Sequence, residues 1–182
     1  MTEFKKMSCR LLIAIGFLAG ATGALAQSSA TATGNATATV IRPITLASSV
    51  DLAFGNVVPS AAGGTLALTA ASPAVPTATG ITQPGTQTGT VTAAVFDVGG
   101  EGAFTYTITL PASAATITGP SAATMTVDTF TSSAVAGTLG TLSGTSGNAG
   151  TQSFYVGGTL HVGSNQAPGA YTGTFSVTVA YN

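Results

Sequence analysis

The chain has very little charge, a single cysteine and no tryptophan. Its 182 residues include four Lys and Arg, five Asp and Glu, and one His. So few cations cannot neutralise a row of phosphates, which excludes nucleic-acid binding as a function class. Cys9 is the sole cysteine and precedes the apolar run near the N-terminus, so we expect neither a disulfide nor a cysteine metal ligand in the exported part.

The N-terminus has the three parts of a secretory signal peptide. Residues 1–10 have a basic character, an apolar run follows over residues 11–24, and the small-x-small sequence Ala24-Leu25-Ala26 comes just before Gln27. We expect cleavage after residue 26, with passage through the periplasm to the cell surface or the extracellular space. A retained N-terminal anchor is the alternative. No later stretch has the roughly 20 apolar residues that a membrane span needs, so no span is expected after cleavage.

Few side chains after residue 26 could carry out chemistry. They are Arg42, Asp51, Asp97, Glu101, Asp128 and His161. A hydrolase triad needs a base beside an orienting acid and a nucleophile, and the only imidazole lies on the threonine side of its predicted strand, as a surface residue would. Asp97 and Glu101 flank Gly99-Gly100, which we interpret as a hairpin turn with solvated carboxylates, weak calcium coordination being an open alternative. We predict no catalytic, cofactor or metal site, and no enzyme.

What replaces charge is an alternation of apolar residues with threonine, serine and glycine. It occurs in short bursts at 66–68, 91–98, 104–110, 123–128 and 154–162, each typical of a strand with one buried face. Within 91–98 the phase shifts at Phe96-Asp97-Val98, which predicts a β-bulge. Turn signals separate the bursts, and no window has a helical period. The pattern predicts an all-β, antiparallel sandwich of about eight to ten short strands, with negligible helix outside the signal peptide and a barrel as the alternative.

Both ends of the exported part also alternate. Residues 171–181 would form a strand of roughly 37 Å, and they contain no lysine, proline or bulge to guard an exposed edge. The residues of this candidate pairing edge are Gly169, Tyr171, Gly173, Phe175, Val177, Val179 and Tyr181. The first segment alternates in the same way until Arg42 interrupts it, and its candidate donor residues are Ala30, Ala32, Gly34, Ala36, Ala38 and Val40.

The ending resembles the C-terminal signature of chaperone-usher pilin subunits. Counted back from Asn182, Tyr181 is second and Gly169 is fourteenth, with alternating apolar residues between them. The resemblance implies an immunoglobulin-like sandwich that lacks its final strand, with a groove that the N-terminal extension of a neighbouring subunit fills in the fibre. It also implies a periplasmic chaperone and an outer-membrane usher as partners, besides copies of the chain itself or related subunits.

The chain as a whole is similar to a family of bacterial secreted domains, numbered 4402, whose function is unknown. The stretches that carry this resemblance are ATATVIRPITL (36–46), LAFGNVV (52–58), FTYTITLP (104–111) and VGGTLHVGSNQAPGAYTGTFSVTVAYN (156–182). The resemblance covers nearly all of the exported part, and the last of these stretches is the most specific. The resemblance defines the type of domain and implies no activity.

We therefore expect three parts: a signal peptide at 1–26, an N-terminal extension or candidate donor strand at 27–42, and a single β-sandwich domain at 43–182. The favoured function is a non-enzymatic, pilus-like fibre subunit assembled by strand donation. The alternative is a self-complete secreted sandwich that acts as an adhesive, matrix or coat protein. Alanine donor residues fill only shallow pockets, since each buried methylene contributes about 0.8 kcal/mol, so pairing within one chain and between chains both stay open.

Overall fold

The computed structural model describes residues 29–134 and 140–182, so the predicted signal peptide lies outside the described residues. The chain divides into two units, residues 1–38 and residues 39–182, and the thirteen assigned strands belong to the second. The predicted fold class is confirmed: the strands pair antiparallel, and the described residues contain no α-helix. Within the same residues there is no helix long and apolar enough to cross a membrane.

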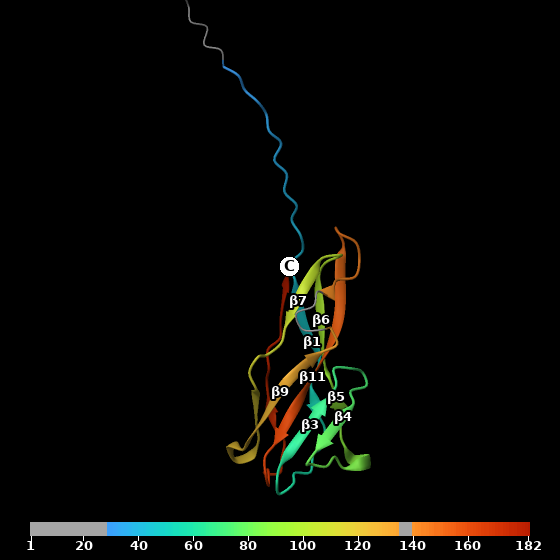
Figure 1. The fold of residues 1–182 in the computed structure, drawn as a ribbon. Helices are drawn as coiled ribbons and strands as arrows, with labels where there is room; N and C mark the ends of the chain where they lie inside the picture. The colour runs from blue at the N-terminus through green and yellow to red at the C-terminus, as the bar shows by residue number, and fades with distance from the viewer. Residues whose placement is uncertain (1–28, 135–139) are drawn as a thin grey trace, which may run out of the picture. The chain divides into compact units, whose positions relative to one another are not determined.

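Eight strands form the larger sheet (Figure 1). Its main path runs β1 (Thr45–Val50), β6 (Ala94–Glu101), β11 (Ala149–Val162), β9 (Thr124–Ser132), β8 (Ala115–Thr118) and β12 (Thr172–Gly173). Off this path, β3 (Gly64–Leu68) pairs with β11 and with β4 (Pro76–Thr79). The long strand β11 lies at the centre, because its first half pairs with β6 and its second half with β3 and β9.

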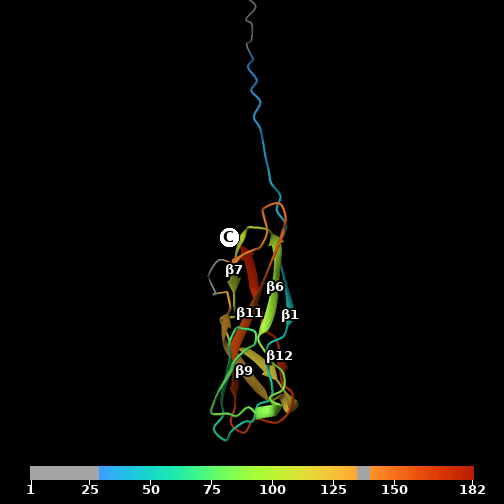
Figure 2. The same cartoon turned by 90° about the vertical axis from the view of Figure 1, so that its right-hand side faces the viewer.

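The remaining strands form two smaller sheets. One has the order β10 (Gly140–Thr141), β7 (Thr105–Thr109) and β13 (Thr178–Tyr181), and the other joins β2 (Ala53–Phe54) to β5 (Val91–Thr92). Figure 2 shows β7 in a layer separate from β6 and β1. Two short 3-10 turns, Gly85–Gln87 and Pro120–Ala122, complete the assigned elements. The number of strands exceeds the expected eight to ten, and four of the thirteen are only two residues long.

The buried side chains form two apolar clusters on one face of the large sheet. The first lies between β6, β11 and the small sheet of β7, and consists of Ala94, Phe96, Val98, Tyr106, Ile108, Leu142, Phe154 and Val156. The second lies farther along β11, and consists of Leu66, Ile81, Val127, Leu160 and Val162. Tyr106 is fully buried, and its hydroxyl donates to Oε1 of Gln152 at 3.0 Å. This burial raises the pKa of Tyr106.

The bulge predicted at Phe96-Asp97-Val98 is wrong. Strand β6 pairs with β11 without interruption from Ala94 to Glu101. The phase of the alternation changes instead at Ala93 and Ala94, which are both buried where the chain passes from β5 to β6. The irregularity at this place lies in the partner strand, because the register of β1 shifts between Ser48 and Val50.

Candidate functional site

The last segment of the chain changes sheets. Instead of one long strand, the structure has two short ones: β12 pairs with β8 in the large sheet, and β13 pairs with β7 in the small sheet. Residues 174–177 between them belong to no strand. Before β12, Gly169 adopts a positive φ of 143° against Pro120, and the hydroxyl of Tyr171 donates to the carbonyl of Ala167 at 2.7 Å. Gly169 and Tyr171 thus shape a loop that leads into the segment.

Strand β13 is an edge strand with no guard on its outer side. Among the described residues it pairs only with β7, and it contains no charge, proline or bulge. The backbone N–H of Asn182 donates to the carbonyl oxygen of Thr105 in β7. Because N–H groups alternate in direction along a strand, those of Val179 and Tyr181 point away from β7. An unpaired row of this kind is a template for another strand.

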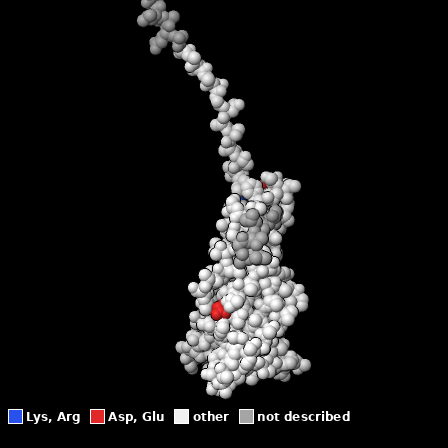
Figure 3. Space-filling model, viewed as in Figure 1, with Lys and Arg blue, Asp and Glu red and all other residues white. Residues whose placement is uncertain are grey.

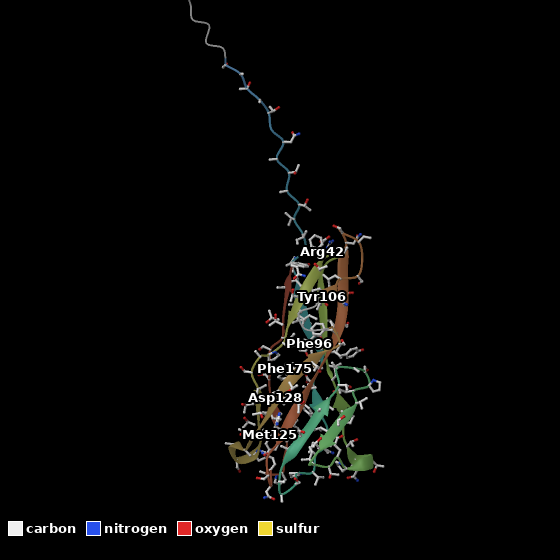
Figure 4. All side chains as sticks on the ribbon, in the orientation of Figure 1. Arg42, Phe96, Tyr106, Met125, Asp128 and Phe175 are labelled. Atoms are coloured by element: carbon white, nitrogen blue, oxygen red, sulfur yellow. The ribbon has the colours of Figure 1, made fainter. Side chains whose placement is uncertain are left out.

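The inner face of the last segment is apolar and only partly covered. Four of the predicted edge residues, Phe175, Val177, Val179 and Tyr181, are half-buried and pack on the first cluster. The ring of Phe175 stacks on Phe130 at 4.9 Å between centroids and meets Phe96 edge-on at 6.0 Å (Figure 4). The segment therefore fixes its side chains on the core even where its backbone has no ladder partner.

A groove of about 1000 Å³ opens beside this segment. Residues 48–57, which include the end of β1 and the chain after it, contribute to one wall. Residues 166–175 form the other wall. Its floor is largely apolar and comes from both clusters and the strands around them: Ala94, Phe96, Ile117, Met125, Val127, Leu160 and Val162. Figure 4 shows Phe96, Phe175 and Met125 in succession along this part of the domain. We call the line between β1 and the last segment the seam, and the groove is its open part.

The other end of the seam is held shut by four residues, Arg42, Glu101, Gly147 and Tyr181, which we call the clasp. The carboxylate of Glu101 accepts from the backbone N–H of Arg42 at 3.2 Å, from its guanidinium at 3.1 Å, and from the N–H of Gly147. The hydroxyl of Tyr181 accepts from the N–H of Glu101 at 2.6 Å and donates to the carbonyl of Arg42 at 3.1 Å. The clasp thus joins the start of the domain to the end of β6, a loop and β13.

Glu101 corrects one expectation from the sequence. Gly99 and Gly100 belong to β6 and not to a hairpin turn, and Glu101 is buried, with 3% of its surface exposed. The N–H of Gly147, followed by that of Arg42, lowers the pKa of its carboxyl group. Its two oxygens are therefore occupied by hydrogen bonds, whereas Asp97 lies apart and bonds the hydroxyl of Ser153. Among residues 29–134 and 140–182 there is no group of three or more His, Cys, Asp or Glu side chains that could hold a metal ion.

His161 lies on the outer face of the large sheet, as the sequence indicated. Its Nε2 is 2.8 Å from Oδ1 of Asp128, and both side chains are well exposed. The hydrogen bond from His161 lowers the pKa of Asp128. In Figure 3 this face of the domain is otherwise almost uncharged. The pair is a surface contact between β9 and β11, and the hydroxyl of Thr129 donates to the same Oδ1 of Asp128 at 2.9 Å and not to the imidazole.

The candidate donor residues divide between the two units. Residues 30–38 belong to the first unit, where the described residues form no strand and their side chains are exposed. Val40 belongs to the second unit and is 96% exposed, and no strand begins before Thr45. The alternation pattern did not predict that Arg42 binds Glu101, because Arg42 was interpreted only as an interruption of the alternation. The signal was present, because Arg42 is the one cation after residue 26 and so the one fixed positive partner for a buried carboxylate.

The fold and the seam together define an antiparallel β-sandwich domain with an unguarded edge and an apolar groove beside it. The chain belongs to the family described as Domain of unknown function (DUF4402), whose family model matches residues 44–181. The match begins one residue before β1 and ends with β13. Comparison with curated proteins found no significant match, and comparison with solved structures found none either.

Proposed function

We propose that this protein is a non-enzymatic structural subunit of an extracellular fibre, assembled by strand donation. The observation that carries the proposal is the apolar groove beside the last segment, where residues 166–175 form one wall and residues 174–177 belong to no strand and include no lysine or proline. Natural edges are usually blunted by lysine, proline or a bulge, because a bare edge recruits other chains. A bare edge beside an apolar groove suits a protein whose partner is another strand.

The donor in this proposal is the segment around residues 30–40 of a neighbouring copy. Its even positions are Ala, Gly and Val and its odd positions are mostly Thr, so one face of an extended strand would be apolar and the other polar. The apolar face would enter the groove, and backbone hydrogen bonds to the edge would supply affinity. The described part of this segment forms no strand in the single chain, which leaves its backbone groups free for such pairing.

The same edge suggests the rest of the assembly route. We propose export by the predicted signal peptide, protection of the edge by a periplasmic chaperone, and passage through an outer-membrane usher to the cell surface. An exposed edge in transit would otherwise pair with unrelated strands. We propose no catalytic role, since His161 and Asp128 form an exposed pair between two strands, and the hydroxyl beside them, that of Thr129, is bonded to the carboxylate and not to the imidazole that would have to activate it.

A second candidate is a self-complete secreted sandwich that acts as an adhesive, matrix or coat protein. The clasp favours it, because it draws the two walls of the seam together at one end without any donated strand. The small donor side chains favour it as well, since alanine methyl groups bury little apolar surface. In this case the groove would remain a surface feature of a monomer.

A gel assay on surface extracts separates the two candidates. A fibre held by donated strands should give regular ladders without boiling that collapse to one band after boiling, and deletion of residues 27–39 should abolish the ladder. Ala36→Asp should do the same, because it places a charge on the apolar face of the donor, whereas Thr37→Asp on the opposite face is the matched control and should leave the ladder intact. A single band in boiled and unboiled wild-type samples would refute fibre assembly.

A further inference from the structure

We infer that the clasp is a stop that sets how far a donated strand extends along the seam. This inference rests on the proposed function, because it concerns the strand that would occupy the groove. In this arrangement the incoming strand pairs beside residues 174–177 and ends there. Strand β13 beyond this point stays closed against β1.

The two walls of the seam lie too close together near the clasp to admit another strand. Neighbouring strands lie about 4.7–4.9 Å apart, so a strand inserted between β1 and β13 needs roughly 9.5 Å between them. Cα atoms of β1 and β13 come within 8 Å of each other. The hydroxyl of Tyr181 also reaches from β13 to the carbonyl of Arg42, three residues before β1 begins. No strand fits there unless the walls separate.

The groove ends before it reaches the clasp. Its lining along the last segment ends at Phe175, and its lining along the opposite wall begins at Ser48. Neither Val179 nor Tyr181 lines it, although both are half-buried and pack on the same cluster as Phe175. The groove therefore opens along one end of the last segment and does not reach Val179 or Tyr181 at the other end.

The hydrogen bonds of the clasp oppose separation of the two walls. Separating the walls would break the hydrogen bond from the hydroxyl of Tyr181 to the carbonyl of Arg42. It would also displace Arg42, which donates two hydrogen bonds to the carboxylate of Glu101. Glu101 is buried, and a buried carboxylate that loses its hydrogen-bonding partners is strongly unfavourable. Gly100 fits this arrangement too, because a Cβ at that position would collide with the hydroxyl of Tyr181. An incoming strand therefore gains more by stopping short of the clasp than by opening it.

Amide hydrogen exchange by NMR on the exported full-length chain tests the stop. The probe is a synthetic peptide with the sequence of residues 29–41, added in excess. We expect alternate amides within residues 174–177 to exchange at least tenfold more slowly with the peptide bound, because only every second N–H points toward the added strand, and the amides of Val179 and Tyr181 to be unchanged. Slowed exchange at Val179 and Tyr181 in the wild-type chain would overturn the stop while supporting strand donation. No slowing anywhere along the last segment would overturn both.

Variants of the clasp make the test independent of one substitution. Tyr181→Phe removes the bridging hydroxyl but keeps the ring, and Glu101→Gln weakens the hold on Arg42 from the other side. In each, peptide binding should extend slowed exchange to residues 179 and 181, whereas Tyr155→Phe on β11 should behave like the wild type. If both clasp variants keep the wild-type pattern, the clasp does not set the end of the donated strand.

Discussion

Replacing Phe175 with alanine tests whether the seam is open in the isolated domain. A fully buried Phe→Ala substitution lowers the free energy of unfolding by about 3–5 kcal/mol. Phe175 is half-buried, and its main contacts are the rings of Phe130 and Phe96, so we expect a loss of about 2 kcal/mol. Phe154→Ala is the matched control, since Phe154 is 1% exposed and stacks on Phe96 at 5.6 Å, and it should lose the full amount.

Urea unfolding followed by circular dichroism measures both variants against the wild type, with the midpoint and slope read separately. Equal losses for Phe175→Ala and Phe154→Ala in the monomer would refute the open seam, because Phe175 would then be as well covered as a core residue. A second measurement compares the unfolding free energies of Phe175→Ala and Phe154→Ala with the peptide of residues 29–41 bound. A donated strand covers the exposed part of Phe175, so the loss at Phe175 should increase toward that at Phe154.

Three other outcomes follow from the structure. Tyr106→Phe removes the hydrogen bond to Gln152 and should destabilise the domain by about 1 kcal/mol, or roughly 3 °C in the melting temperature. An unchanged melting temperature would mean that this hydrogen bond contributes nothing to stability. Because the folded pKa values of Glu101 and Asp128 are lowered, their stabilisation is present above the unfolded values of 4.5 and 3.8 and is lost as pH falls through the folded values. The free energy of unfolding, measured by urea denaturation at intervals from pH 7 to pH 2, should therefore decline with pH. The decline should be smaller in Glu101→Gln. His161→Gln should change stability at pH 7 by less than about 0.5 kcal/mol, as surface substitutions do, and a larger loss by thermal melting would contradict the surface role.

The alternation of apolar and polar residues predicted the strands well where one strand stays in one sheet. In 104–110 and 154–162 the apolar positions fill the core and the threonines point outward, because a period of two has only one way to bury its apolar face. The last segment could not be predicted in the same way. Its side chains keep the same alternation while its backbone leaves one sheet for another, and alternation reports only which face is buried.

The contacts of the clasp could not be predicted from the sequence for a different reason. Gly99-Gly100 has the composition of a turn, and nothing local shows that Gly100 is needed because the hydroxyl of Tyr181 lies against it. Glu101 and Arg42 are 59 positions apart, so neither residue indicates its partner from its own surroundings. Contacts that close a sandwich depend on tertiary structure, and short-range patterns do not contain them.

The central strand β11 determines how the domain comes apart. Phe154 and Val156 on its first half belong to one apolar cluster, and Leu160 and Val162 on its second half belong to the other. Neither cluster can lose its order while β11 stays intact, and β11 cannot detach without disrupting both. Calorimetry should therefore record a single endotherm with equal van't Hoff and calorimetric enthalpies, and in the proposed fibre each subunit would unfold as a whole under force.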